Sequence, residues 1–216
     1  SGKYFDSSLL KKLGDILLKH KNIYISSDDI YEHIHWNKEK FHNIVNACPE
    51  LKDRVIVLNG VSKAYSMTGW RIGYAAGDKE IIKKMKTLQS QSTSCASSIS
   101  QAAACEALSK VCEEMPLMTQ EYKKRHDYVV EQLNKIDGVI CKETDGTFYV
   151  FPSFRKYISN SDNIANDNQL ALHLLNVAKV AVVPGSAFGQ EGHIRLSIAI
   201  DIDSLKEAMK RISNSL

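Results

Sequence analysis

The chain has 216 residues, of which 44% are hydrophobic and 25% charged, and its formal net charge at pH 7 is +3. This composition is ordinary for a globular protein of one large or two small domains. The lysines and arginines are scattered among acids, which argues against a surface for nucleic acid or polyphosphate. No apolar run approaches the roughly 20 residues that cross a bilayer. No signal-peptide pattern opens the chain, so we expect a cytoplasmic protein with no membrane contact.

The cysteines favour the same compartment. There are five, an odd number, and no two of them are spaced as a CxxC pair. A disulfide framework needs paired cysteines, and a zinc site needs clustered ligands. We therefore expect reduced thiols and no metal site.

The first half of the chain alternates helical patterns with apolar extended ones, which is typical of an α/β domain with a mostly parallel sheet. Its predicted helices lie at 8–20, 78–89 and 99–115, and its predicted strands at 22–27, 54–61 and 71–77. A Ser/Thr-rich loop is expected at 90–98. In the first helix one stripe is apolar and predicts a single buried face. The residues of that stripe are Leu9, Leu10, Leu13, Ile16 and Leu17.

The character of the sequence changes near residue 110. Pro116 is expected to break or kink the chain, and a helix then runs to a stop at Gly138. We therefore expect two domains. Residues 1–110 would form the later part of a large domain, and residues 111–216 an interdomain helix followed by a small α+β domain.

The small domain carries a turn signal and a capping signal. Asp145-Gly146 stands between two apolar segments and predicts a tight β-hairpin. Ser204 and Glu207 have the spacing of a capping box and predict the start of the last helix. Further strand candidates lie at 178–185 and 193–200.

One lysine stands out by its surroundings. Lys63 follows the apolar run RVIVLNGV and has small and polar neighbours, and Arg71 comes eight residues later. A lysine amine can attack a carbonyl to form a Schiff base, and burial helps by lowering its pKa. Taken alone, however, a lysine after a strand is far more often a solvated surface residue.

Companions for such a lysine are present if the carbonyl belongs to pyridoxal phosphate. That cofactor needs an acid at its pyridine nitrogen, a donor at its ring oxygen and a cation at its phosphate. Asp28 and Asp29 stand at the end of the first strand, where α/β ligand sites lie, and Tyr31 follows. Arg71 can make a two-pronged contact with a phosphate. Each residue alone has a plainer reading as a helix cap, a turn or an edge ion pair.

Four segments together resemble a known family. GVSKAYSMTGWRIG (60–73) resembles the lysine signature of class I pyridoxal-phosphate aminotransferases, with a small residue three before the lysine and an arginine eight after it. SDDIYEHI (27–34), AVVPGSAFG (181–189) and HIRLS (193–197) are similar to further motifs of that family, in the same order. The serine- and alanine-rich segment that begins SQSTSCASS resembles bacterial aspartate aminotransferases in particular.

The resemblance implies part of the fold-type-I large domain followed by the small domain. It also implies pyridoxal 5'-phosphate as cofactor and a homodimer with active sites at the subunit interface. The residue roles that it implies are Lys63 as the catalytic, cofactor-bound lysine, Asp28 at the pyridine nitrogen, Tyr31 at the ring oxygen, Arg71 and Ser62 at the phosphate, and Arg195 at the substrate carboxylate.

The resemblance covers the C-terminal half of the family. Ser1-Gly2 is similar to the end of an earlier family motif, so we expect the chain alone to be inactive and to bind the cofactor weakly. The activity implied is transamination between an amino acid, aspartate, and a 2-oxo acid, 2-oxoglutarate. The alternatives are an aromatic or prephenate aminotransferase, a lyase on the same scaffold, or a non-catalytic fragment.

Overall fold

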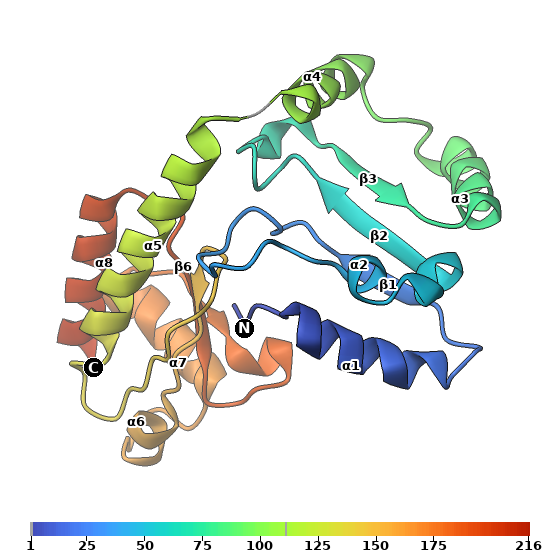
Figure 1. The fold of residues 1–216 in the computed structure, drawn as a ribbon. Coiled ribbons are helices and arrows are strands. Elements are labelled where there is room, and N and C mark those ends of the chain that lie inside the picture. Colours follow the sequence, from blue (N-terminus) through green and yellow to red (C-terminus); the bar gives the residue numbers. More distant parts are fainter. Residues whose placement is uncertain (1, 111) are drawn as a thin grey trace. The chain divides into compact units, whose positions relative to one another are not determined.

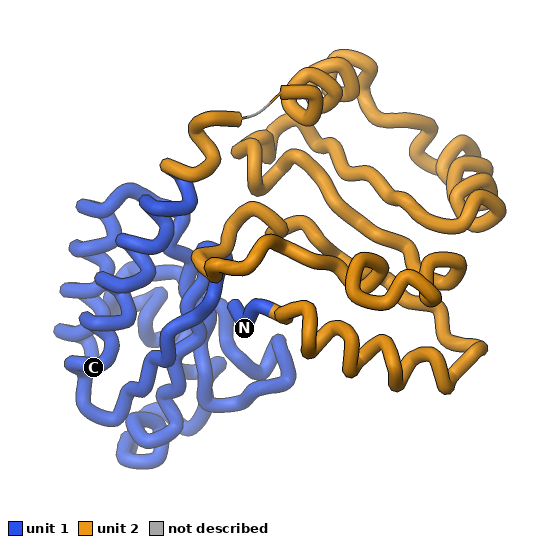
Figure 2. Tube along the Cα trace, viewed as in Figure 1, with its two compact units in different colours: residues 1–4, 118–216 blue, residues 5–117 orange. Residues whose placement is uncertain are grey.

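The computed structural model describes residues 2–110 and 112–216 (Figure 1). It divides into two compact units (Figure 2): one runs from Phe5 to Leu117, and the other comprises the residues up to Tyr4 together with Met118–Leu216. Ser1, which the resemblance matched to an earlier motif, lies outside the described residues, as does Val111. The domain limits expected from the sequence stay a prediction. No helix in the part of the chain described is long and apolar enough to cross a membrane.

The unit from Phe5 to Leu117 is built on a three-stranded sheet in the order β1-β2-β3. The strands are β1 (Ile25–Asp28), β2 (Val55–Gly60) and β3 (Gly73–Ala76), which confirms the three predicted strands with bounds that differ by up to three residues. β1 and β2 are parallel, whereas β3 runs antiparallel to β2. The carboxyl ends of β1 and β2 and the start of β3 therefore lie at one edge of the sheet.

The helices of this unit begin where the sequence supplies caps. They are α1 (Ser7–Leu18), α2 (Ile44–Ala47), α3 (Lys79–Ser92) and α4 (Ser98–Ser109), with 3-10 turns at Pro49–Arg54 and Thr68–Trp70. Asp6 and Asp78 cap α1 and α3 by accepting backbone N–H groups, which are otherwise left without partners at a helix start.

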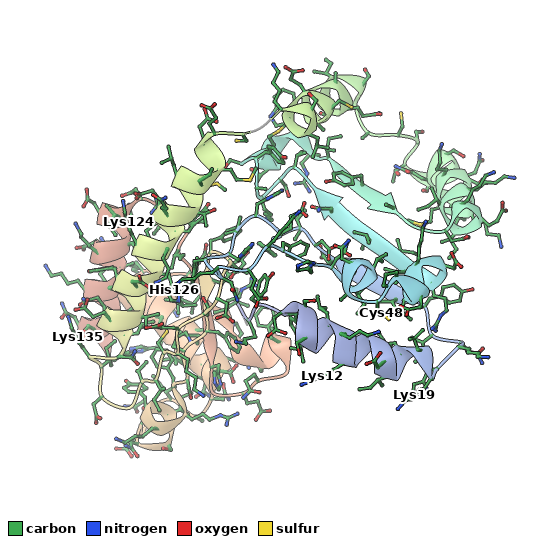
Figure 3. The ribbon with its side chains drawn as sticks, in the orientation of Figure 1. Lys12, Lys19, Cys48, Lys124, His126 and Lys135 are labelled. Carbon is green, nitrogen blue, oxygen red and sulfur yellow. The ribbon has the colours of Figure 1, made fainter. Side chains whose placement is uncertain are left out.

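Helix α1 packs on only part of its apolar stripe. Leu10 and Gly14 are buried against a core that includes Cys48, Leu51 and Val55. Cys48 is labelled beside α1 in Figure 3. The expectation of one buried face is wrong for three members, since Leu9, Leu13 and Ile16 are 41%, 41% and 54% exposed. Gly14 and Cys48 can lie this close together because Gly14 has no side chain that would keep the two segments apart.

The second unit has an antiparallel sheet in the order β4-β6-β5. Its strands are β4 (Tyr149–Val150), β5 (Val183–Pro184) and β6 (Ile194–Ser197). Its helices are α5 (Glu114–Leu133), which begins in the other unit, α6 (Arg155–Ser159), α7 (Asp167–His173) and α8 (Ile202–Ser215), with a π-helical turn at Leu174–Ala178 and a 3-10 turn at Gly185–Phe188. Pro116 does not break α5, because it lies in the first turn, where a missing N–H leaves no bond unmade.

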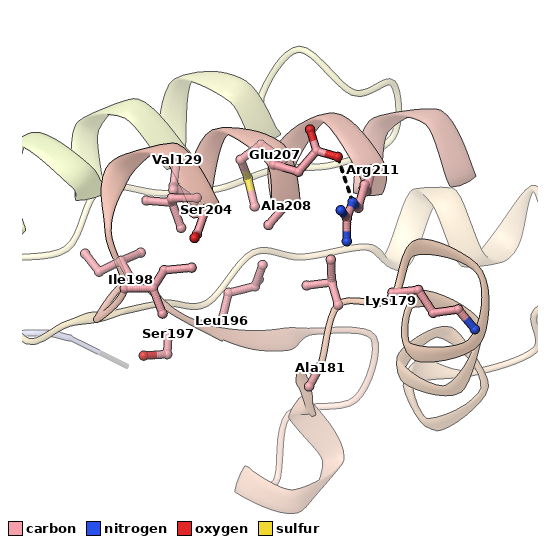
Figure 4. A pocket seen from close by; sticks show the side chains of 14 residues that line it. Val129, Lys179, Ala181, Leu196, Ser197, Ile198, Ser204, Glu207, Ala208 and Arg211 are labelled. Carbon is pink, nitrogen blue, oxygen red and sulfur yellow. Dashed lines mark hydrogen bonds and ion pairs between the residues drawn. The ribbon is translucent and has the colours of Figure 1, made fainter.

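The core of this unit lies between α8, α5 and the sheet. Leu205, Met209 and Ile212 form the buried face of α8. A pocket of about 390 Å³ remains between α8, β6 and residues 179–181 (Figure 4), and the Glu207–Arg211 ion pair of 2.8 Å lies at its rim. Its lining residues include none of the predicted site residues.

The predicted hairpin at Asp145-Gly146 is wrong. β4 pairs with β6, and the segment before Asp145 contributes only an isolated bridge. Asp145 instead holds the first residues of the chain, since its Oδ2 accepts the Tyr4 N–H at 3.1 Å and contacts Lys3 Nζ at 2.8 Å. The left-handed backbone falls on Thr147 (φ 68°) and not on the glycine.

Two further contacts in this unit concern the start of α8 and the attachment of Thr144 to α5. The N-terminal cap of α8 is Asp201, whose Oδ1 accepts the Ser204 N–H at 2.8 Å, so the predicted capping box is wrong by three residues. His126 of α5 is fully buried (Figure 3), and its Nε2 accepts the Thr144 N–H at 3.0 Å. Because the backbone can only donate, the neutral ring carries its proton on Nδ1, 2.9 Å from an Asp127 oxygen.

The fit between α1 and its neighbour is testable at Gly14. A Cβ there would lie 2.7 Å from Cys48 Cβ and 2.9 Å from Cys48 Sγ. Gly14→Ala is expected to lower the free energy of unfolding by about 1–3 kcal/mol through overpacking. Alanine is the better helix former by only about 1 kcal/mol. Urea denaturation measures the difference. Gly69→Ala is the control because its Cβ meets nothing within 4 Å. A Gly14→Ala protein as stable as its parent would contradict this packing.

Candidate functional site

Lys63 lies in a turn at residues 62–65, near the start of the connection 61–72 between β2 and β3. The turn closes on itself, since Met67 N–H donates to Val61 O at 3.4 Å and Ser66 N–H donates to Lys63 O at 3.2 Å. Lys63 and its neighbour Ser62 are partly buried. The lysine is thus carried on a segment that is held by its own backbone hydrogen bonds.

Arg71 lies near the other end of the same connection, just before β3. Gly60 and Gly73 are register partners of the antiparallel pair, so Lys63, three residues after one, and Arg71, two before the other, lie at the same end of β2 and β3. Arg71 has a left-handed backbone (φ 55°, ψ 46°), and its Nη1 donates to Thr68 O at 3.0 Å. A non-glycine residue in this region costs about 1–3 kcal/mol, and such strain is concentrated at functional sites.

Gly60 explains how the two strands come so close beneath Lys63. A Cβ at Gly60 would lie 2.9 Å from Ile72 O and 3.1 Å from Ile30 Cδ1. Only a glycine leaves room for the backbone beside Arg71 and for the turn after β1. The ends of all three strands therefore converge at this glycine.

Asp28 ends β1 at the same edge of the sheet. It is the register partner of Leu58 in the parallel pair, and the next residue continues the contact, because Asp29 N–H donates to Leu58 O at 2.8 Å. Asp28 is exposed and its Oδ1 accepts the Ile30 N–H at 3.3 Å. Tyr31 follows in the turn after β1 and is partly buried.

The two neighbouring acids differ in surroundings. Asp29 is 7% exposed, and its Oδ1 accepts a hydrogen bond from Ser27 Oγ at 2.7 Å. Burial raises the pKa of the Asp29 carboxyl above its usual value, against the opposing hydrogen bonds from Ser27 and Asn43. Asp28 is thus the acid open to a ligand at this edge, and Asp29 is part of the packed turn.

Arg195 belongs to the other unit, where it lies on β6 opposite Val183. Its guanidinium carbon lies 4.4 Å from the ring centre of Tyr149 and 4.5 Å from that of Phe188. Neither aromatic contact was predicted from the sequence. Phe148, which precedes Tyr149, is buried, and its ring makes tilted contacts with Tyr122 and Tyr149 at 5.6 and 4.6 Å between ring centres.

The register of the sheet explains the contact with Tyr149. Tyr149 of β4 pairs with Ser197 of β6, so Arg195 is its diagonal neighbour on the same face, within reach of a long side chain. Strand alternation places Phe148 on the opposite face, toward the core. The alternation of the strands was visible in the sequence, but the contact of Arg195 with Tyr149 could be predicted only with the pairing of β4 with β6.

The arrangement brings five of the six predicted residues into one unit. At one edge of its sheet stand an amine, a carboxylate and a guanidinium on Lys63, Asp28 and Arg71, with the Tyr31 phenol and the Ser62 hydroxyl beside them. These groups can react with a carbonyl, hold a protonated ring nitrogen and bind an anion. The sixth residue, Arg195, is carried by the other unit.

Comparison with known proteins gives a consistent result. Residues 1–212 match the family described as aminotransferase class I and II. An aspartate/prephenate aminotransferase of Nitrosomonas europaea is 46% identical over 221 residues, covering 100% of this chain and 56% of the relative. An aspartate aminotransferase of Rhizobium meliloti is 42% identical over 217 residues, covering 99% and 53%.

Solved structures agree. The crystal structure of the aspartate aminotransferase from Rhizobium meliloti superposes with a TM-score of 0.94 at 42% identity, covering 100% of this chain and 55% of that one. An aromatic aminotransferase from Pyrococcus horikoshii OT3 has a TM-score of 0.88 at 32% identity, covering 99% and 56%. The chain spans about half the length of the relatives that it matches.

The buried acid Asp29 gives a pH test of the site's framework. Its folded-state pKa is raised, so its contribution favours folding most at low pH, and stability is lost as pH rises through that pKa. Asp29→Asn keeps an acceptor oxygen for Ser27 and removes the buried charge. We expect the variant to lose this pH dependence and to be more stable than its parent at pH 7.

Urea midpoints at pH 4 and pH 7 measure the effect, and Asp53→Asn, which changes an exposed carboxylate, is the control. If Asp29→Asn and its parent showed the same change between the two pH values, the burial of the Asp29 charge would not matter to folding.

Proposed function

Because the chain belongs to the class I and II aminotransferases, we propose that the protein carrying it exchanges amino groups between an amino acid and a 2-oxo acid with pyridoxal phosphate. The names of its relatives favour aspartate as the amino donor, with 2-oxoglutarate as the acceptor that we expect. One observation carries the proposal: the connection that holds Lys63 and Arg71 lies at the same sheet edge as Asp28.

The residue types at this edge fit the cofactor group by group. The aldehyde needs an amine, which Lys63 provides. The ring nitrogen needs an acid, and Asp28 is exposed at the end of β1, whereas Asp29 is buried. The phosphate needs a cation with several donors, and Arg71 has a fork of N–H groups of which one is bonded to Thr68 O.

The residues would divide the work as follows. When bound, pyridoxal phosphate supplies an electron sink for the carbanion at the substrate Cα. Lys63 Nζ would take a proton from that carbon and deliver it to the C4′ carbon of the cofactor. The Asp28 carboxylate would keep the ring nitrogen protonated, because an adjacent negative charge favours the charged form.

The remaining residues would hold and orient. The Tyr31 hydroxyl would donate to the ring oxygen, and Arg71 with the Ser62 hydroxyl would bind the phosphate. Arg195 would bind the substrate α-carboxylate through two parallel N–H···O contacts, for which its planar fork is suited. The contacts of its guanidinium with the Tyr149 and Phe188 rings use none of its N–H donors, which supports this role.

A second substrate has its own support. The Nitrosomonas relative is named for both aspartate and prephenate, and an aromatic aminotransferase is among the similar structures. We therefore propose prephenate as a further amino acceptor. A lyase reaction on the same scaffold and a non-catalytic role are the alternatives, and neither is favoured by a named relative. The homodimer, the cytoplasmic location and the weak cofactor binding of this chain alone stay predictions.

Borohydride labelling tests the assignment of Lys63. The protein is mixed with pyridoxal phosphate and reduced, and the modified peptide is identified by mass spectrometry. We expect one label per chain on Lys63 and loss of that label in Lys63→Ala, together with nearly all transamination. Lys86→Ala, which changes an exposed lysine of α3, should keep both.

The isolated chain and the full-length protein are labelled side by side. Stronger labelling of the full-length protein is expected because this chain spans only about half of its relatives. Equal labelling of Lys63→Ala and its parent would refute the role of Lys63.

A further inference from the structure

The guanidinium of Arg195 lies over two aromatic rings, and it forms no ion pair with any of the described residues. The Tyr149 and Phe188 rings lie 4.4 and 4.5 Å from its central carbon. No hydrogen-bond acceptor for its N–H groups is found among residues 2–110 and 112–216. A contact with ring faces uses none of the N–H donors, so they stay available to a ligand, and the two rings limit the directions in which they can point.

The two rings are held very differently. Tyr149 lies on β4 and is fixed by the sheet. Phe188 is 48% exposed and ends the 3-10 turn Gly185–Phe188, so burial does little to keep it in place. Its other aromatic contact is edge-on with Phe151, at 6.1 Å between ring centres. The position of the Phe188 ring therefore depends on the loop that carries it, residues 185–192.

Asp167 ties this loop down at two points. It is 1% exposed, and its Oδ2 accepts the Ser186 N–H at 2.7 Å while its Oδ1 accepts the Gly192 N–H at 3.4 Å. Burial opposes the charge, but the hydrogen bonds from Ser186 and Gly192 outweigh it and lower the pKa of Asp167, so the carboxylate is charged at neutral pH.

A helix-capping role does not account for this carboxylate. Asp167 is the first residue of α7, where an acid is generally favourable. However, the cap of α7 is already supplied by Asn166, whose Oδ1 accepts the Gln169 N–H at 2.9 Å. Both oxygens of Asp167 are directed to the loop, one near each of its ends.

We propose that Asp167 is a positioning residue for Arg195: it holds the loop 185–192 so that the Phe188 ring, with Tyr149, orients the Arg195 guanidinium toward a substrate carboxylate. The inference rests on the proposed function of Arg195. Phe188 is a second positioning residue in the same series, between the carboxylate of Asp167 and the guanidinium.

The test uses the full-length protein with its cofactor. Succinate, a dicarboxylate without an amino group, serves as the probe, and its Kd is measured by calorimetry alongside KM and kcat for aspartate. Asp167→Asn and Phe188→Leu should each raise the succinate Kd and the aspartate KM about tenfold, with kcat changed much less, because the carboxylate is bound in ground and transition states alike.

Asp201→Asn is the matched control. Asp201 also accepts a backbone N–H at a helix start, from Ser204 at 2.8 Å, and its pKa is also lowered, but it caps α8 and holds no part of the loop. It should lower thermal stability and leave the succinate Kd within about twofold. The double variant Asp167→Asn/Phe188→Leu should bind succinate no more weakly than the worse single variant, since both changes act through one ring.

The possible outcomes separate the two proposals. If Arg195→Ala left succinate binding unchanged, the proposed function of Arg195 would fail. If Arg195→Ala weakened binding but Phe188→Leu did not, the positioning proposal alone would be overturned, even if Asp167→Asn failed to fold. A double variant with the full product of the two single effects would likewise show that Asp167 does not act through Phe188.

Discussion

The pairing of β2 with β3 is the constraint on which the candidate site depends. Gly60 faces Gly73 across the ladder, and a Cβ at Gly60 would lie 2.9 Å from Ile72 O. A side chain at this position would therefore collide with the backbone just before β3. The connection between the two strands, residues 61–72, is partly held by its own hydrogen bonds, and its two ends place Lys63 and Arg71 at one end of the sheet. Without the pairing of β2 with β3, the two ends of this connection, and so the amine and the guanidinium, would have no fixed spacing.

The left-handed backbone of Arg71 shows where sequence reasoning reached its limit. The apolar pattern predicts a strand from Arg71 onward, but β3 begins at Gly73. Periodicity reports which residues can be extended and buried, and it carries no information on a single strained residue before the strand. The placement of Asp28, Lys63 and Arg71 near strand ends was predictable because the strand patterns are local, and their roles stay a prediction. The turn geometry that joins them was not, because it is set by the contact of two strands.

The errors in the rest of the fold have one physical origin. Asp145-Gly146 has the composition of a tight turn, yet Asp145 bonds to Tyr4 and Lys3, more than 140 positions away in sequence. Ser204 and Glu207 have the spacing of a capping box, but the cap is Asp201, three residues before Ser204, which accepts the Ser204 N–H. The apolar stripe of helix α1 is only partly covered, on the side toward Cys48. In each case the local sequence was compatible with more than one structure, and contacts with other residues determined which one forms.

The proposed role of Arg195 shows why an arginine that binds a carboxylate is better held by rings than by an acid. An ion pair would occupy the N–H donors that a carboxylate ligand needs, and binding would then have to break it. Stacking contributes about 0.5–2 kcal/mol per ring and uses none of these donors. Fixing the side chain in advance also removes part of the roughly 2 kcal/mol of rotamer entropy that an arginine otherwise loses on binding. Tyr149 on a paired strand and Phe188 on a loop bonded to Asp167 supply such a holder from three separate parts of the sequence. For this reason no local motif could reveal it.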